Sequence, residues 1–361
     1  MTSTSVDTGA VDRSAPRSRH RMLTVGAPLY VRIDVRVLTA VGILAVIALL
    51  AGVLGLVLGS LSIPLDRLVA VFLGDGTRIE RTVVTQWRAP RVVAGLVLGA
   101  ALGLSGAIFQ SLTRNALGSP DIIGFSTGAH AGGIITIILL GDGVLSVSAG
   151  AIIGGLATAM VIYLLAWSRG VQGFRLIIVG IGVTAMISSV NTWLIMRADL
   201  DIAMAAATWG VGSLNGLSWS KVVPAMIMIM LLTIAVWSQA RPLRQMEMGD
   251  DLAKALGTDT ERSRLIMIVI GVGLVAIATA TAGPIAFVAL AAPQIARRVT
   301  GAAGTTLLGS AAVGAVLLSV ADLVAQHAFG ERQVPVGVVT VSIGGLYLVW
   351  LLIHEARRQL A

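Results

Sequence analysis

The chain has 361 residues, of which 56% are apolar and only 12% are charged, and its mean hydropathy is +0.90. A soluble domain usually contains about 45–50% apolar and about 25% charged residues, so this composition excludes an ordinary soluble protein. Long uninterrupted apolar runs also disfavour an outer-membrane β-barrel, whose strands alternate. The sequence therefore predicts an all-α, polytopic membrane protein with about ten transmembrane helices.

Several chemistries are excluded by the residues that the chain lacks. It has no cysteine, which removes disulfides, Cys-ligated zinc, iron–sulfur clusters and thiol nucleophiles, and its four histidines are scattered. No G-x-x-x-x-G-K-[ST] phosphate-binding loop occurs, so we expect no ATP, other cofactor or metal on this chain and no catalytic residues. The chain has a net charge of +8, and its basic residues lie between the apolar runs. This placement indicates membrane topology rather than a nucleic-acid partner.

The basic first 36 residues are followed by an apolar run that is too long for a signal-peptide core. We therefore expect a disordered cytoplasmic arm at 1–36, a transmembrane domain at 37–355 and a cytoplasmic tail at 356–361. The run 265–296 is too long for one span and is broken at Pro284, because a proline inside a helix costs about 3 kcal/mol. The stretch 202–220 predicts a short re-entrant or surface helix. The expected spans are 37–63, 92–112, 122–140, 143–167, 176–196, 222–240, 265–282, 285–298, 301–321 and 334–353.

Basic residues set the expected orientation in the membrane. Both ends are basic, so both are expected in the cytoplasm, which requires an even number of spans. Ten spans place 18 of the 26 basic residues inside. Five of the other eight crowd the first external loop, against the usual bias: Arg67, Arg78, Arg81, Arg88 and Arg91.

The motif Arg88-Ala-Pro-Arg91 is expected to close this external loop and to open the second span, with Pro90 near the helix start. Two interpretations stay open from the segment alone. The arginines could be interfacial anchors that reach the lipid headgroups. They could instead be a cationic docking patch for an acidic partner outside the membrane.

The segment 239–264 is expected to be a cytoplasmic loop that contains a short helix. Asp250 and Asp251 suit the positive N-terminal end of a helix, and Gly257 suits its stop. Leu252, Ala255 and Leu256 place small apolar groups on one face. A solvated linker helix and a helix that engages a cytoplasmic protein both fit this pattern.

Charge is nearly absent from the apolar runs, where Asp322, His130 and Asn191 are the main strongly polar residues. An ion-coupled carrier commonly needs acidic or His groups near the middle of the membrane, and an integral-membrane enzyme needs a polar cluster at one face. The sequence disfavours both the carrier and the enzyme. They remain the alternatives to the function that the family resemblance below implies.

Taken together, several segments resemble the FecCD-type permease subunits of ABC importers for ferric siderophores, haem and vitamin B12. They run in the family's order over nearly the whole chain. The C-terminal segment, Val334-Pro-Val-Gly followed by Gly344-Gly-Leu-Tyr-Leu-Val-Trp, is most similar to the ferric-enterobactin permease subgroup. The other matching segments are Arg88–Arg91, Gly103–Gln110, Asn115–Gly124, Trp209–Leu214, Gly249–Gly257 and Gly283–Arg297.

The resemblance implies roles for named residues. Arg88 and Arg91 match positions that meet an external substrate-binding protein, and the family's third docking arginine is replaced by Gln326, with Arg332 nearby as a substitute. The turn with Arg169, Gln172 and Arg175 falls where the family closes its cytoplasmic gate. Residues implied to couple to the ATPase are Asp250, Asp251, Leu252, Ala255, Leu256 and Gly257.

The resemblance also implies the function and the partners. We expect a permease subunit that translocates a ferric siderophore across the cytoplasmic membrane, driven by ATP hydrolysis on a separate subunit. The same machinery for haem or cobalamin is the alternative within the class. The expected partners are a second permease subunit, as a heterodimer rather than a homodimer, two ATPase copies, an external siderophore-binding protein and the lipid bilayer.

Overall fold

The computed structural model describes residues 22–25, 31–59, 61–140, 143–167, 173–302, 304–330 and 333–359. These residues form a bundle of α-helices, preceded by a short antiparallel hairpin of β1 (Met22–Val25) and β2 (Val31–Asp34). The all-α prediction is confirmed. The hairpin belongs to the segment that was expected to be a disordered arm, and 1–21 and 26–30 of that arm lie outside the described residues.

Within the described residues, seven helices are long and apolar enough to cross a membrane. One of them is α4 (Ala89–Thr113) together with the helical turns that precede it. The other six are α1 (Val35–Val57), α7 (Val144–Ala166), α8 (Gly173–Arg197), α10 (Trp219–Ser238), α13 (Thr260–Ala282) and α15 (Leu307–His327).

Three shorter or partly polar helices supply the remaining predicted spans: α6 (Phe125–Leu140), α14 (Val288–Thr300) and α16 (Val336–Gln359). With 13 residues, α14 rises only about 20 Å, which is less than the roughly 30 Å hydrocarbon core. The ten predicted helices are therefore present, with α14 as a partial span. Helix α16 continues to Gln359, so the first residues of the segment expected as a cytoplasmic tail are helical.

The break at Pro284 is confirmed. Helix α13 ends at Ala282, and α14 begins at Val288 after a non-helical connection. Gly283 (φ +74°) and Phe287 (φ +68°) both adopt left-handed backbone conformations there. The next span starts later than predicted, at Leu307 rather than near 301, because Gly301 (φ +63°) ends α14.

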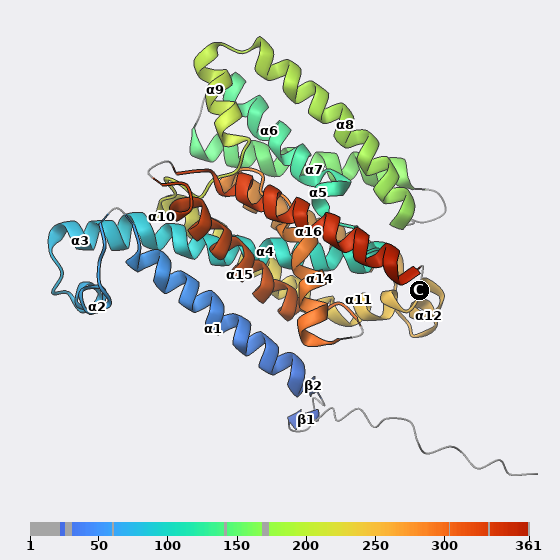
Figure 1. The fold of residues 1–361 in the computed structure, drawn as a ribbon. Helices are drawn as coiled ribbons and strands as arrows, with labels where there is room; N and C mark the ends of the chain where they lie inside the picture. Colours follow the sequence, from blue (N-terminus) through green and yellow to red (C-terminus); the bar gives the residue numbers. More distant parts are fainter. Residues whose placement is uncertain are drawn as a thin grey trace, which may run out of the picture.

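Helix α4 lies at the centre of the bundle and contacts α13, α14 and α15 (Figure 1). Its glycines permit close backbone approach, as small residues do between membrane helices. A Cβ on Gly103 would lie 2.1 Å from the Ser310 carbonyl oxygen of α15, and one on Gly106 would lie 1.7 Å from the Ala289 oxygen of α14. These two glycines therefore set how closely α4 packs against α14 and α15.

The segment between α1 and α4 differs from the expected loop. It contains α2 (Leu65–Leu73), α3 (Arg78–Thr82) and the π-helical turn η1 (Val83–Arg88), and the last two continue directly into α4. Helix α4 itself begins at Ala89 with Pro90 at its start, as expected, but the preceding helical turns extend the continuous helix back to Arg78, where Thr77 and Glu80 form a capping box. The π turn accommodates Pro90, which has no N–H to donate in a regular α-helix.

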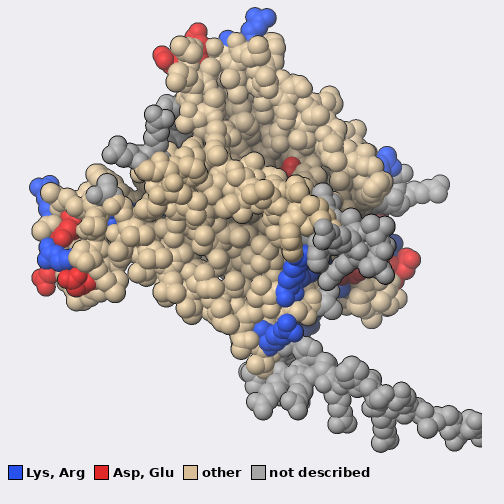
Figure 2. All heavy atoms as spheres, in the orientation of Figure 1, with Lys and Arg blue, Asp and Glu red and all other residues tan. Residues whose placement is uncertain are grey.

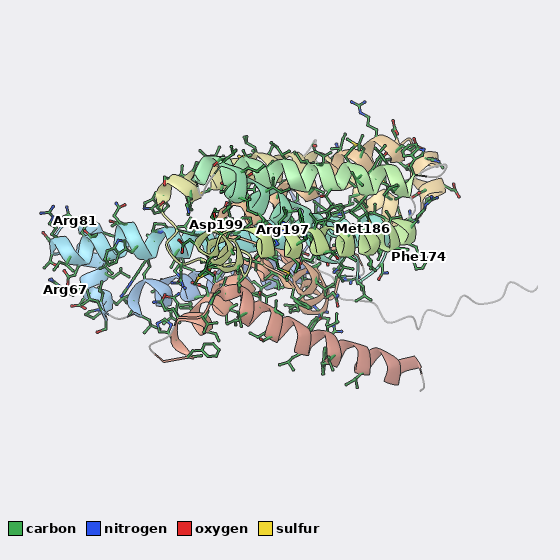
Figure 3. All side chains as sticks on the ribbon, turned by 90° about the horizontal axis from the view of Figure 1, so that it is seen from above. Arg67, Arg81, Phe174, Met186, Arg197 and Asp199 are labelled. Carbon is green, nitrogen blue, oxygen red and sulfur yellow. The ribbon has the colours of Figure 1, made fainter. Side chains whose placement is uncertain are left out.

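The two ends of the bundle carry different elements. The start of α1 and the end of α16 lie at the same end as the short helices α11 (Ala240–Glu247) and α12 (Asp250–Ala255), and we call this the α12 end (Figure 1). Helices α2 and α3 lie at the opposite end, the α2 end. Arg197 and Asp199 lie toward the same end as Arg67 and Arg81, whereas Phe174 lies at the other end (Figure 3).

Charged side chains gather toward these ends and leave a broad uncharged surface between them (Figure 2). This distribution suits a chain whose middle is surrounded by lipid. The short helix expected within 202–220 is confirmed as α9 (Leu200–Trp209), which lies at the α2 end. A four-residue helix, α5 (Pro120–Ile123), joins α4 to α6.

Candidate functional site

The α12 end carries the segment predicted to couple to an ATPase, and ion pairs fix it to the bundle. Asp250, the first residue of α12, pairs with Arg264 of α13 at 2.8 Å and with Arg114, the residue that ends α4. Arg114 also donates through Nε to the Met246 carbonyl oxygen at 2.9 Å. The start of α12 is therefore connected directly to two central helices.

The protonation state of Asp250 follows from these contacts. Burial alone would raise the pKa of this carboxyl group. The hydrogen bonds and charges of Arg264 and Arg114 outweigh burial and hold its pKa below the ordinary value. Asp250 is consequently ionised at neutral pH, which keeps both arginine contacts formed.

An apolar stripe on this loop faces away from the bundle. Leu252 and Leu256 are 47% and 54% exposed, and Met248, four residues before Leu252, is 60% exposed. Asp251 and Ala255 are exposed as well, whereas Ala253 is buried against the bundle. Exposed large apolar groups in a row are typical of a surface that another protein covers.

Gly257 ends α12 as predicted. Its φ is +84°, a left-handed conformation that favours glycine, and the Thr258 N–H donates to the Ala253 carbonyl oxygen at 2.9 Å. A Cβ at Gly257 would meet no atom within 4 Å. The requirement for glycine at this position is therefore conformational and not steric.

At the α2 end, Arg88 has partners inside the chain. Its guanidinium donates to the carbonyl oxygens of Leu56 at 2.7 Å and Val57 at 3.2 Å, and also to that of Leu61. Leu56 and Val57 are the last residues of α1, whose carbonyl groups lack intrahelical partners. Arg88 thus ties the end of α1 to the start of α4.

Arg91 also points into the bundle and forms a two-pronged ion pair with Asp322 of α15. Nε lies 2.9 Å from Oδ2, and Nη2 lies 2.8 Å from Oδ1. The side chains are 13% and 7% exposed, and Gln326 donates a further hydrogen bond to the same carboxylate. Any external partner that uses Arg91 must therefore share it with Asp322.

Three of the predicted site residues, Arg169, Gln172 and Arg332, lie outside the described residues. Arg175 is described and exposed near the start of α8, and its guanidinium approaches the Leu165 carbonyl oxygen at 3.4 Å. No group of three or more His, Asp or Glu residues that could hold a metal ion occurs in the described part of the chain.

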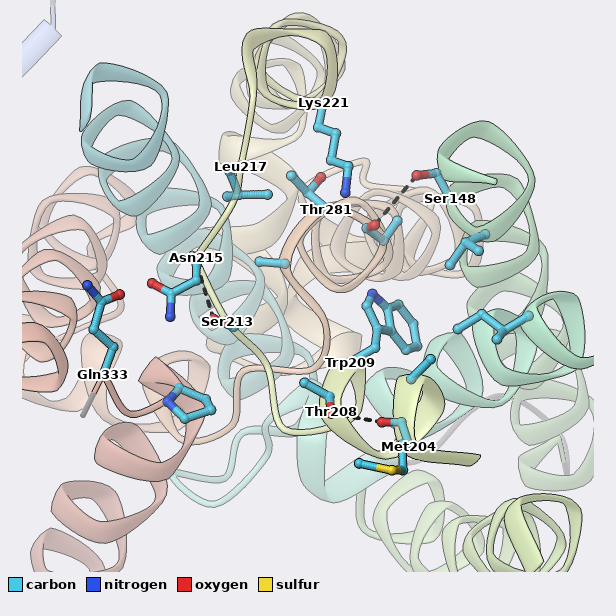
Figure 4. A pocket seen from close by; sticks show the side chains of 16 residues that line it. Ser148, Met204, Thr208, Trp209, Ser213, Asn215, Leu217, Lys221, Thr281 and Gln333 are labelled. Carbon is cyan, nitrogen blue, oxygen red and sulfur yellow. Dashed lines mark hydrogen bonds between the residues drawn. The ribbon is translucent and has the colours of Figure 1, made fainter. Parts of the chain in front are cut away.

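A cavity of about 700 Å³ opens at the α2 end, between α6, α7, α9, α10, α13 and the residues before α16 (Figure 4). Polar side chains, the indole of Trp209 and the ammonium group of Lys221 line it. Lys221 was not among the residues predicted from the sequence. The sequence did mark this residue, because Lys221 is one of only two lysines in the chain and directly precedes an apolar run.

Other residues of these sites were also missed. Asp322 was noted as an isolated acid, but its partner lies 231 positions away in the sequence. Arg114 and Arg264 were not predicted as site residues, although each anchors α12 through Asp250. Met248 was omitted from the apolar face, even though its four-residue spacing from Leu252 was a signal in the sequence.

Comparison with known proteins identifies the chain's relatives. A model of the FecCD transport family matches residues 46–354. The chain belongs to the FecCD transport family. This FecCD family member is 48% identical over 309 residues to the ferric enterobactin transport system permease protein FepG of Escherichia coli (strain K12), which covers 86% of this chain and 94% of FepG.

Two further comparisons agree with this assignment. The chain is 34% identical over 304 residues to the iron(3+)-hydroxamate import system permease protein FhuG of Bacillus subtilis (strain 168), covering 82% and 90% of the two chains. A solved inward-facing structure of a metal-chelate type ABC transporter matches with a TM-score of 0.77 at 26% identity, covering 88% of this chain and 99% of that one. The predicted family is confirmed, and the chain is a multi-pass membrane transport component.

Proposed function

We propose that this FecCD family member is a permease subunit of an ABC importer that carries a ferric siderophore inward across the cytoplasmic membrane. The observation that carries the proposal is the α12 end. An exposed apolar stripe of Met248, Leu252 and Leu256 is fixed through Asp250 to α4 and α13. A surface of this kind suits a cytoplasmic ATPase whose movements must reach the membrane helices.

Ferric siderophore is the substrate class that the similarity to FepG and FhuG supports. Haem and cobalamin complexes are the competing substrates within the same class of machine. ATP hydrolysis takes place on a partner chain, since this sequence has no phosphate-binding loop of the P-loop type.

We place docking of the external binding protein at the α2 end. Arg88 and Arg91 would contribute positive charge there even while they bind Leu56, Leu61 and Asp322, and Arg332 is the third proposed contact. Because both described arginines serve the packing of the bundle, the docking role is secondary to a structural one. Exposed ion pairs are worth about 0.2–1 kcal/mol each, so each contact contributes modestly.

The assembly would contain a second, different permease subunit and two ATPase copies. Helix α8 presents exposed apolar side chains, since Met186 and Trp193 are 71% and 57% exposed. These side chains would contact a protein partner or lipid. The turn with Arg169, Gln172 and Arg175 is the proposed cytoplasmic gate. Both termini would lie in the cytoplasm together with the α11–α12 loop.

Uptake by proteoliposomes tests this function. Vesicles that contain the permease pair and the ATPase receive the loaded binding protein outside and ATP at the ATPase face. We expect accumulation of a ferric siderophore only when all components and ATP are present. Uptake driven by an ion gradient without nucleotide would instead indicate a secondary carrier, and uptake of haem or cobalamin alone would identify the competing substrate.

A further inference from the structure

A narrow apolar groove lies where α14, α15 and α16 pack against one another (Figure 1). Among the described residues that line it, only Thr340 and Tyr347 carry a polar side chain, and the Thr340 hydroxyl already donates to the Gly337 carbonyl oxygen at 3.1 Å. The groove has a volume of about 240 Å³, below the range of about 300–1,000 Å³ that is usual for ligand pockets. Its size therefore suits part of a flexible apolar chain better than a complete small-molecule ligand.

The groove opens on the surface of the bundle within the apolar spans. Val320 of α15 and Ile343 of α16 line it, and both side chains are exposed. An apolar space of this kind does not hold ordered water, which needs polar partners. In a membrane, an acyl chain of the surrounding lipid is the apolar group at hand to fill it.

One face of α14 leads from this groove to a positive charge. Val288, Ala291, Ile295 and Arg298 recur at intervals of three and four residues, so they lie on the same side of the helix. The first three line the groove, and Arg298 belongs to the last turn of α14. This turn lies at the α12 end, because a Cβ on Gly301 would be 2.7 Å from Cζ of Arg36, near the start of α1.

Aromatic side chains of α16 hold the guanidinium of Arg298 beside the groove. Its Cζ lies 4.9 Å from the centre of the Trp350 ring, and that ring lies 5.9 Å from the ring of Tyr347, which lines the groove. The neighbouring Arg297 borders a different, polar cleft together with Glu247. Arg298 is therefore the arginine of this turn that serves the groove.

The Tyr347 hydroxyl adds a polar group to the apolar wall. Its oxygen is buried and has no hydrogen-bond partner among the described residues. A buried hydroxyl without a partner costs free energy, which a ligand that carries an oxygen acceptor would recover. The groove thus combines an apolar wall, one hydroxyl donor and, beside it, a guanidinium at the α12 end.

We propose that this groove binds an anionic phospholipid. One acyl chain would lie between α14, α15 and α16, and the phosphate would lie at Arg298 within reach of the Tyr347 hydroxyl. A guanidinium has five N–H donors, so it can bind a phosphate and still keep other partners. Basic positions at the membrane surface favour lipids with net negative charge over zwitterionic ones.

The lipid site goes beyond the proposed function and does not depend on it. It requires only that the chain lies in a bilayer, so a failure to transport iron would leave it standing, and loss of the site would leave the transport proposal intact.

The test is phospholipid binding to the purified complete transporter, measured by native mass spectrometry. The probes are phosphatidylglycerol and phosphatidylcholine with identical acyl chains, titrated separately. We expect phosphatidylglycerol to bind roughly fivefold more tightly, and Arg298→Gln to remove that preference by weakening phosphatidylglycerol alone. Arg298→Lys keeps the charge and should keep most of the preference.

Two matched controls separate the groove from the rest of the surface. Arg262→Gln removes one positive charge from an exposed side chain at the start of α13, outside the groove, and should bind both lipids normally. Val320→Trp fills the groove and should weaken both lipids. Val269→Trp, at an exposed valine of α13 outside the groove, should weaken neither.

A photoreactive group at the end of an acyl chain of phosphatidylglycerol locates the site. We expect it to label peptides from the groove segments 287–295, 316–321 and 340–347. Wild-type binding of phosphatidylglycerol by Arg298→Gln would overturn the assignment. Absence of label from these segments would also overturn it and would indicate that a partner subunit covers the groove, and displacement of the lipid by soluble glycerol phosphate would indicate a site for a free anion instead.

Discussion

At the scale of single residues, Arg91 and Asp322 form the most informative contact. The pair joins α4 to α15 near the α2 end and is almost completely removed from solvent. Removing one partner from such a pair leaves a buried charge uncompensated, which costs about 3–5 kcal/mol. The residue proposed for docking is thus also required for packing.

We predict that Arg91→Ala lowers the thermal unfolding temperature of the detergent-solubilised protein. Arg91→Glu should lower it further, because two carboxylates then face each other. The double variant Arg91→Leu/Asp322→Leu should recover most of the loss, since both charges are removed together. If Arg91→Ala unfolds at the wild-type temperature, the ion pair does not stabilise the bundle, and an uptake defect in that variant would point to docking alone.

Gly257 gives a second prediction at the residue scale. A residue with a Cβ at φ +84° costs about 1–2 kcal/mol, so Gly257→Val should distort the end of α12. We expect normal insertion but reduced association with the ATPase, measured by co-purification. Gly257→Asn should be milder, because asparagine tolerates this conformation better.

Gly42→Ala in α1 is the control for this substitution, since a Cβ there also meets no atom within 4 Å and its backbone is helical. Equal ATPase association of Gly257→Val and Gly42→Ala would show that the turn after α12 has no part in coupling.

At the scale of elements, α12 is a short helix with two different faces. One face is fixed through Asp250 and Ala253, and the other presents Leu252 and Leu256 to the exterior. This separation allows the exposed side chains to be changed without disturbing the anchor.

We predict that Leu252→Ser/Leu256→Ser leaves the unfolding temperature unchanged, because surface substitutions usually alter stability by less than about 0.5 kcal/mol. Binding of the ATPase should fall at least roughly tenfold, as expected when central apolar contacts of an interface are lost. Leu73→Ser, an exposed leucine at the α2 end, should bind the ATPase normally. Wild-type binding by the double variant would mean that the ATPase contacts another surface.

Local chemistry determined which elements could be predicted from sequence. The break after α13 follows from Gly283 and Pro284, and the end of α12 follows from Gly257, since each residue acts within its own turn. The helix before α4 was missed because Pro90 suggested a helix start, although the Thr77 and Glu80 capping box marked the true start. The pairing of Arg91 with Asp322 and the cavity around Lys221 depend on packing between distant segments, which no spacing rule provides.

At the scale of the whole molecule, the structure brings the start of α1, the end of α16 and the α11–α12 loop to one end of the bundle (Figure 1). The cysteine-free sequence makes the proposed orientation simple to measure, because any introduced thiol is unique. In intact cells, an impermeant maleimide should label Asp75→Cys and should fail to label Asp251→Cys until the membrane is opened. The reverse pattern would invert the topology and contradict the cytoplasmic assignment of the loop.

The central claim is that ATP hydrolysis on a partner chain drives a ferric siderophore through this permease by way of α12. The most direct measurement is iron accumulation in proteoliposomes that contain the complete transporter and the loaded binding protein. We predict uptake against a gradient with ATP, none with a non-hydrolysable analogue, and a loss of at least roughly tenfold in Leu252→Ser/Leu256→Ser with the permease still folded. Accumulation that continues without ATP, or at the wild-type rate in the double variant, would contradict the account.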